Sequence, residues 1–513
     1  MSLSRFVPFV SVLALSIGST AIAQDVPLME DIVSAYEAED FVTARTGLAQ
    51  IAETGNPVAQ YRYGRILFEG RGGPRDLENA AVWLEKAAAQ NNGPAATLLA
   101  KMLLGGVGVK PDPERAVSFL QRSATRGDQE AQYTLGLLMQ QGVGIDADPE
   151  QAFNWLLAAA EAQHISSQYA LSEAYAKGVG VQKSAADAVF WLRKAAVNGS
   201  RGAQIDLAIR LDEGDGVAQD RAEAVSWLTR AADKGHPMAQ RILGSKFLAG
   251  DGVDKNASEA LKWLEAAAAQ GDALAQSNLG YAYYSGEAGE QSDAKAFEWY
   301  QRAASAGLVR SMLALGLMYQ NGRGTEADPL QAASLYESAM LAGNEIGKIK
   351  LGQVVASGAL DGRYDRRKAA TWVAAAAKDG DDNATEWLVA QSASGNQRAT
   401  GQLAMIYLAD EDRKDEALEL LADAANAGDS FSQFKLGEMH ASGTGVEQDF
   451  VVAHKWMNVA ATLGSKAAEE QREILSQLLT PEQLADAQAQ ARVYFEQEKQ
   501  RAPDTDQTVK ITE

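Results

Sequence analysis

A pattern of small and apolar residues recurs every 36 positions along most of this 513-residue chain. Each copy opens on a small residue, and stepping by 36 from the first gives Ala59, Ala95, Ala131, Ser167, Ala203, Ala239, Ala275, Ser311 and Gly347. Eleven positions later stand Gly70, Gly106, Gly142, Gly178, Gly214, Gly250, Gly286, Gly322 and Gly358. A further copy begins at Ser432. A fixed period of this length is typical of helical repeat arrays, in which each unit buries its apolar face against its neighbours.

Each copy reads as two helices joined by a glycine turn. In the copy from Ala131, residues 131–141 form the first helix, and Gly142 supplies the left-handed backbone that commonly ends a helix. Asp148 and Pro149 are a favoured N-cap and first helical residue for the second helix. The apolar stripe of this second helix is Ala152, Trp155, Leu156, Ala159 and Ala160.

A large apolar residue, usually tryptophan, stands 24 positions into each copy. The tryptophans of this ladder are Trp83, Trp155, Trp191, Trp227, Trp263, Trp299, Trp372 and Trp456. They belong to the apolar stripe of the second helix, so we interpret them as core residues between stacked hairpins. The alternative is a sugar-binding stripe of exposed rings.

The glycine pair Gly142 and Gly144 could pass for part of a phosphate-binding loop. Such a loop occurs once in a chain, follows a strand and needs more than two glycines. Here the pair recurs in copy after copy between two helices. We therefore interpret it as a turn.

The repeat resembles the Sel-one-like repeat (SLR) family, which is related to the tetratricopeptide repeats. The motif A-x-x-x-L-G-x-x-Y/M-x-x-G-x-G-V, followed by A-x-x-W-L-x-x-A-A-x-x-G, matches well in 239–271 and 432–464. The resemblance implies an all-α fold, a right-handed α-solenoid of stacked two-helix hairpins whose first helices line a concave surface. It also implies an adaptor or scaffold role, which exported bacterial members have in signalling, envelope assembly or exopolysaccharide secretion.

The repeat register and its breaks predict the organisation of the chain. The predicted parts are a signal peptide (1–23), N-terminal capping helices (24–56), the repeat solenoid (57–380), an irregular repeat with a kink (381–430), a final repeat (431–464), C-terminal capping helices (465–500) and a disordered tail (501–513).

The first residues have the layout of a secretory signal peptide. Arg5 precedes an apolar run, and Ala21-Ile22-Ala23 forms a small-residue cleavage site. An uncleaved membrane anchor is the alternative, but the serine, threonine and glycine residues of this run make it more polar than a typical membrane-spanning helix. We expect cleavage after Ala23, a periplasmic or secreted protein, and no membrane span in the mature chain. Because the chain contains no cysteine, we also expect no lipid anchor of the bacterial lipoprotein type.

The net charge of −21 argues against a nucleic-acid partner, because an acidic surface repels phosphates. We find no catalytic constellation, no metal-ligand spacing and no cofactor motif. Ser292 and Lys295 match the S-x-x-K signature of penicillin-interacting enzymes, but the S-D-N and K-T-G elements of that class are absent. Ser292 also stands where a serine caps the following helix.

A candidate binding surface lies on first-helix positions that do not enter the core. Aromatic and amide side chains suited to peptides or glycans gather there in three successive copies: Asn278, Tyr281, Tyr284, Gln320, Asn321, Lys350 and Gln353. The alternative is that the tyrosines fill gaps in the apolar packing between neighbouring hairpins.

Three functions remain open at this point. The first is a non-enzymatic periplasmic scaffold for protein–protein interactions in envelope assembly or signalling. The second is a protein that binds a glycan such as peptidoglycan or an exopolysaccharide. The third is a penicillin-interacting hydrolase that uses Ser292.

Overall fold

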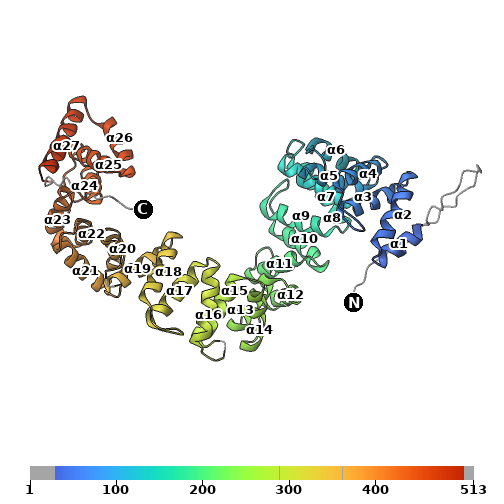
Figure 1. The fold of residues 1–513 in the computed structure, drawn as a ribbon, viewed down its shortest axis with the longest axis horizontal. Coiled ribbons are helices and arrows are strands. Elements are labelled where there is room, and N and C mark those ends of the chain that lie inside the picture. The colour runs from blue at the N-terminus through green and yellow to red at the C-terminus, as the bar shows by residue number, and fades with distance from the viewer. Residues whose placement is uncertain (1–28, 288, 361, 502–513) are drawn as a thin grey trace, which may run out of the picture. The chain divides into compact units, whose positions relative to one another are not determined.

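The computed structural model describes residues 29–287, 289–360 and 362–501. In these ranges the chain forms 27 α-helices and one 3₁₀ turn, η1 (Glu411–Arg413), and contains no strand (Figure 1). Within each of its two compact units, most helices that follow one another in sequence pack against one another. The fold is therefore the expected all-α solenoid of two-helix repeats.

The helices divide between two compact units. One unit extends to Ala239 and includes Asp251–Asp254, and the other comprises Gln240–Gly250 and the chain from Lys255 onward. The first unit contains α1 (Met29–Glu37), α2 (Phe41–Glu53), α3 (Pro57–Glu69), α4 (Leu77–Ala89), α5 (Gly93–Gly105), α6 (Pro113–Ala124), α7 (Gln129–Gln141), α8 (Pro149–Glu161), α9 (Ile165–Lys177), α10 (Ala185–Val197), α11 (Arg201–Glu213) and α12 (Arg221–Asp233).

Most of α13 (Pro237–Ala249) belongs to the second unit. The remaining helices are α14 (Ala257–Ala269), α15 (Ala273–Ser285), α16 (Asp293–Ser305), α17 (Val309–Asn321), α18 (Pro329–Leu341), α19 (Glu345–Ala356), α20 (Arg366–Lys378), α21 (Asp382–Ala393), α22 (Gln397–Tyr407), α23 (Lys414–Asn426), α24 (Ser430–Ser442), α25 (Phe450–Thr462), α26 (Lys466–Leu478) and α27 (Pro481–Arg501).

Local sequence signals set the ends of these helices. Gly142 ends α7 with a φ of 70° and donates its backbone N–H to the carbonyl of Leu138. The carboxylate of Asp148 accepts from the backbone N–H of Gln151 at 2.9 Å and caps α8. Both ends lie where the sequence predicts them.

The second glycine of several turns lies close against the backbone of the preceding hairpin. Gly144 also has a φ of 70°, and a β-carbon placed on it would collide with the carbonyl oxygen of Pro113. Gly108, Gly180 and Gly216 meet the backbone of the preceding second helix in the same way. The pair is thus a turn that fits closely against its neighbour, as the sequence indicates.

In many hairpins a side chain of the second helix packs into a notch at a glycine of the first helix. Leu156, directly after Trp155, is fully buried, and a β-carbon on Gly136 would lie 2.9 Å from its Cγ. Equivalent notches occur at Gly64 with Leu84 and at Gly244 with Leu264. The notch brings the two helices close together.

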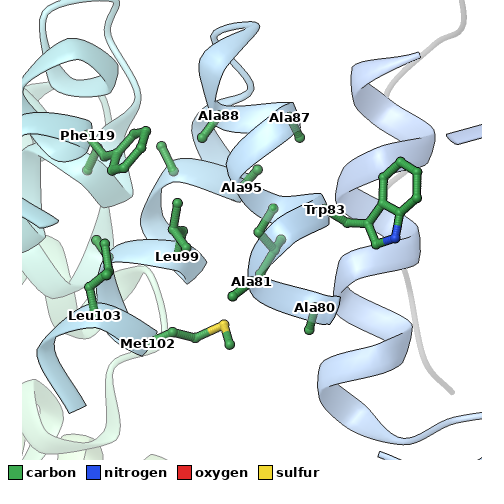
Figure 2. Packing of buried hydrophobic residues seen from close by; sticks show 14 of the residues in the cluster. Ala80, Ala81, Trp83, Ala87, Ala88, Ala95, Leu99, Met102, Leu103 and Phe119 are labelled. Atoms are coloured by element: carbon green, nitrogen blue, oxygen red, sulfur yellow. The ribbon is translucent and has the colours of Figure 1, made fainter. Parts of the chain in front are cut away.

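The ladder tryptophans lie beside this buried position. Trp83, Trp191, Trp227 and Trp456 are 5–9% exposed, whereas Trp155, Trp263, Trp299 and Trp372 are half-buried. Trp83 belongs to the same buried cluster as Leu99 and Phe119, and in the view of Figure 2 its ring projects from the opposite side of α4. A cation covers several of the rings, as Arg230 does at 4.5 Å from the centre of the Trp227 ring.

A buried glutamine joins successive hairpins. Gln168 on α9 donates from Nε2 to the carbonyl of Ala160 on α8 at 3.2 Å and accepts at Oε1 from Asn198 on α10 at 3.0 Å. One side chain therefore connects three helices. The same bond to a carbonyl eight residues earlier is made by Gln60, Gln132, Gln204, Gln276 and Gln433.

The repeat changes between residues 381 and 430. Here α22 and α23 form one hairpin, while α21 packs against α20 and α22 without a second helix of its own. This unpaired helix is the odd third helix that the sequence indicates, and the kink stays a prediction. The signal peptide and all of the predicted tail except Arg501 fall outside the described residues.

Candidate functional site

A cavity of about 440 Å³ opens among the first helices of the second unit, and we call it the Tyr300 cavity. Its walls come from α13, α15 and α17 and from one side chain of α16. Its lining consists of Ser245, Leu248, Ala249, Ser277, Asn278, Tyr281, Glu287, Tyr300, Arg310 and Ala314. A volume of this size falls within the range of ordinary ligand pockets.

Tyr300 replaces the usual leucine that follows the ladder tryptophan. Its ring lies in the notch at Gly280, where a β-carbon would be 2.7 Å from the tyrosine Cδ1. Because a tyrosine is longer than a leucine, the side chain that begins on α16 lines a cavity among the first helices. Tyr300 is only 6% exposed, and burial raises the pKa of its hydroxyl to about 12. The hydroxyl therefore stays protonated, and it has no hydrogen-bond partner among the described residues.

Arg310 brings a positive charge to the cavity. Its Nε donates to Ser277 Oγ at 2.8 Å, and one terminal nitrogen donates to the carbonyl of Leu274 at 3.1 Å and to Asn278 Oδ1 at 2.7 Å. All three acceptors are neutral. Burial is the main cause that lowers the pKa of Arg310, while the charge of Asp272 acts in the opposite direction from beyond ion-pair distance.

Other arginines of this unit that reach a neighbouring hairpin are paired with an aspartate. Arg241 lies 3.2 Å from Asp272, and Arg323 lies 2.6 Å from Asp293. The position equivalent to Asp272 in the next repeat is Leu308, which explains why no carboxylate is supplied there.

Tyr281 and Glu287 stand on the rim of the cavity. The Tyr281 side chain is 52% exposed, and its hydroxyl lies 3.4 Å from Glu287 Oε1. Asn278 donates to Ser245 Oγ at 2.9 Å and so connects α15 to α13. The cavity thus combines an exposed ring, a positive charge and several fixed donors.

Nine segments of the chain match the Sel1 repeat, and together they cover more than half of it: 57–92, 93–128, 129–164, 165–200, 202–236, 237–272, 273–308, 309–344 and 430–465. The chain belongs to the Sel1 repeat family. Sel1 repeats typically build protein-interaction scaffolds rather than catalytic centres.

One solved structure with the same fold is c5321, a protective antigen present in uropathogenic Escherichia coli strains. It is 28% identical with a TM-score of 0.58, over 91% of this chain and 99% of that one. A Sel1 repeat protein from Oxalobacter formigenes is 27% identical with a TM-score of 0.48, over 66% of this chain and 98% of that one. No functionally curated protein matches the sequence significantly.

The structure places only two of the seven predicted surface residues, Asn278 and Tyr281, in the lining of the Tyr300 cavity. Tyr284 is half-buried, with the Arg323 guanidinium 3.9 Å from its ring centre. For Tyr284 the gap-filling alternative is therefore the better description.

The other predicted residues do not line this cavity. Gln320 accepts a hydrogen bond from Tyr336 at 3.1 Å, and Asn321 is exposed at the end of α17. Lys350 donates to Gln353 at 2.9 Å, so these two side chains bind each other.

Sequence reasoning missed Tyr300, Arg310 and Ser277, which complete the cavity. Two signals could have found them. Tyr300 breaks the Trp-Leu pair of the Sel1 repeat, as Tyr336 does in the next copy, and Arg310 lies in the first turn of a helix whose usual polar cap is replaced by Leu308. The two departures together distinguish this copy from the others.

Ser292 acts as a helix cap. Its hydroxyl accepts from the backbone N–H of Lys295 at 3.4 Å, and the Lys295 ammonium lies 4.9 Å from the centre of the Tyr283 ring. The lysine of the S-x-x-K motif therefore lies over an aromatic ring.

Within the described ranges, no group of three or more histidine, aspartate or glutamate side chains is arranged so that it could hold a metal ion.

A second cavity of about 360 Å³ lies at the starts of α20, α22 and α24. Arg366, Arg367 and Arg398 contribute to its lining. Arg398 is paired with Asp429 at 2.8 Å, so part of the positive charge is already compensated. The Tyr300 cavity is therefore the stronger candidate site.

Proposed function

We propose that this Sel1 repeat protein is a non-catalytic scaffold that holds partner proteins on the surface formed by its first helices. The Tyr300 cavity is the anchoring point in this proposal. The observation that carries the proposal is a cavity of about 440 Å³ that is lined both by the exposed ring of Tyr281 and by Arg310, whose hydrogen bonds go to neutral acceptors. Aromatic and arginine side chains are the residue types that contribute most to protein interfaces.

The scaffold acts outside the cytoplasm in this proposal. The support is the sequence from Arg5 to Ala23, which has the layout of a cleavable signal peptide. No helix in the described part of the chain has the length and apolar character needed to cross a bilayer. Fractionation of cells that produce the full chain tests this directly. We expect a shortened form that starts at Gln24 in the periplasm or medium, and a full-length cytoplasmic protein would contradict it.

Photocross-linking in intact cells tests the anchoring point. A photoreactive amino acid replaces Tyr281, and the same replacement at Leu317 serves as the matched control. Leu317 stands 36 positions later in the next repeat and is 36% exposed. We expect a discrete protein adduct from position 281 that is weaker or absent from position 317.

The outcomes separate the candidate functions. A protein adduct from position 281 supports the scaffold. Equal adducts from both positions would contradict the assignment of this cavity. Retention of the protein on insoluble peptidoglycan or exopolysaccharide, lost in Tyr281→Ala, would favour the glycan-binding alternative.

A further inference from the structure

We infer that the Tyr300 cavity takes the C-terminal carboxylate of a partner polypeptide, with Arg310 as its counter-ion. This inference rests on the proposed scaffold function and specifies the chemistry of the partner. It depends on the donors that line the cavity and on the charge of Arg310, which forms no direct ion pair with a carboxylate among the described residues.

The cavity offers donors that its own residues leave unused. The second terminal nitrogen of Arg310, the hydroxyl of Tyr300 and the hydroxyl hydrogen of Ser277 have no acceptor among the described residues. A carboxylate carries two oxygens and accepts several hydrogen bonds at once, so it matches a site that is rich in donors. The two N–H groups on this terminal nitrogen of Arg310 can donate charge-assisted hydrogen bonds to the carboxylate.

Existing hydrogen bonds hold Arg310 in place before any ligand arrives. Ser277 Oγ, the Leu274 carbonyl and Asn278 Oδ1 all belong to α15 and fix three of its N–H groups at 2.7–3.1 Å. Asn278 is itself held by its bond to Ser245 at 2.9 Å. A guanidinium fixed in this way loses little further freedom on binding, which favours affinity.

The rim restricts which carboxylate can enter. Glu287 places a negative charge beside Tyr281 and would repel a second acidic group of the ligand. Leu248, Ala249 and Ala314 give the lining an apolar part, and the Tyr281 ring is half exposed above it. A chain end supplies one carboxylate next to a single side chain and can enter the cavity end-on. The preferred ligand is therefore a C-terminus whose last side chain is apolar or aromatic.

Two hexapeptide libraries with randomised final residues test the inference. Both carry an N-terminal fluorophore; one ends in a free carboxylate and the other in an amide. Fluorescence anisotropy with the full protein is expected to show binding of free-carboxylate peptides that end in apolar or aromatic residues. Amidation should weaken it by about tenfold or more, the usual effect of losing a charge-assisted hydrogen bond. Arg310→Gln should weaken binding of the free-carboxylate peptides to the level of the amides.

Two further variants keep the test decisive. Arg302→Gln is the matched control, because Arg302 covers the Trp299 ring at 4.5 Å and does not line the cavity. It should bind as the unchanged protein does. Tyr300→Phe removes one donor and no bulk, and it should reduce binding even if Arg310→Gln proves unstable by circular dichroism.

The inference fails if amidated and free peptides bind equally, if Arg310→Gln keeps full affinity, or if peptides with internal glutamates bind regardless of their ends. A protein adduct from position 281 combined with any of these results would overturn the C-terminus assignment and leave the scaffold function standing. Absence of that adduct would instead count against the scaffold itself.

Discussion

At the scale of single residues, glycine meets two separate requirements in this protein: a left-handed backbone conformation and a close approach to a neighbouring hairpin. Gly142 and Gly144 both have a φ near 70°, a conformation that costs other residues about 1–2 kcal/mol. Gly144 has the further constraint that the Pro113 backbone leaves no room for a β-carbon. The two constraints can be separated experimentally, because some left-handed glycines of the chain face open space.

Replacing Gly144 with alanine should destabilise the first unit more than the same change at Gly127. Gly127 has a φ of 88° with no atom within 4 Å of an added β-carbon, so Gly127→Ala carries only the backbone cost. Gly144→Ala adds a steric conflict, for which we expect a further ~1–3 kcal/mol. Urea unfolding followed by circular dichroism measures the difference, and equal midpoints would contradict the close approach.

The ladder tryptophans predict a large effect at Trp227. Trp227 is 6% exposed, and its Nε1 donates to Glu223 at 3.0 Å. Trp227→Ala should therefore cost roughly 3–5 kcal/mol, as for other large buried aromatic residues. Trp155→Ala, at a half-buried ring of the same ladder, should cost less in the same urea assay. A loss below about 1 kcal/mol at Trp227 would show that it is not a core residue.

At the scale of helices, α17 differs from other first helices in how it begins. Side chains such as Asp128, Ser200, Asp272 and Asn344 cap the equivalent helices, whereas Leu308 makes no side-chain cap hydrogen bond. The first turn of α17 therefore lacks the acceptor that its neighbours have. The same departure from the repeat removes a carboxylate from the surroundings of Arg310.

Supplying the missing cap should stabilise the second unit. Leu308→Asn introduces the residue that caps α3, α5 and α19, and a cap of this kind is worth about 1 kcal/mol. Leu308→Ala removes the same leucine without adding an acceptor and is the matched control. Thermal melting should place Leu308→Asn above Leu308→Ala, and the reverse order would contradict the capping argument.

The helices were predictable from sequence because their signals are local. Gly142 and Asp148 act on residues within the same turn, so a reader of the sequence can place both. The cavity depends instead on residues from different hairpins. Arg310 meets Leu274 and Ser277, which lie 36 and 33 positions earlier, and Tyr300 reads in the sequence as an ordinary core residue. Only the packed helices bring these groups together, and this is why Tyr281 and Asn278 were found without their partners.

At the scale of the whole molecule, repeats hold together through contacts between neighbours alone. Stability in such arrays is the sum of the repeats and of the interfaces that join them. The buried glutamines contribute to those interfaces at regular intervals, since each one bonds a side-chain amide to the last turn of the preceding helix. We expect the stability of each interface between repeats to depend on how many hydrogen bonds its glutamine makes.

Gln168 and Gln204 give a direct comparison of two junctions. Both donate to an alanine carbonyl, at 3.2 and 3.0 Å, but only Gln168 also accepts, from Asn198. Gln204 Oε1 is buried without a partner among the described residues. Gln168→Ala should therefore cost about 1–3 kcal/mol and Gln204→Ala less. Amide hydrogen exchange across α8 to α12 measures both losses, and a larger loss at Gln204 would contradict this account.

The notch at Gly280 has a consequence for how such a protein can change. Tyr300 begins on the second helix of its hairpin and reaches the cavity among the first helices, where we propose that a partner binds. At position 300 a tyrosine in place of the usual leucine adds a hydroxyl to the lining of the cavity, whereas Tyr336, in the equivalent notch at Gly316, is fully buried and donates to Gln320. A substitution at a buried position of the second helix can therefore change which ligand such a repeat array binds, although the substituted residue does not belong to the helices that form the binding surface.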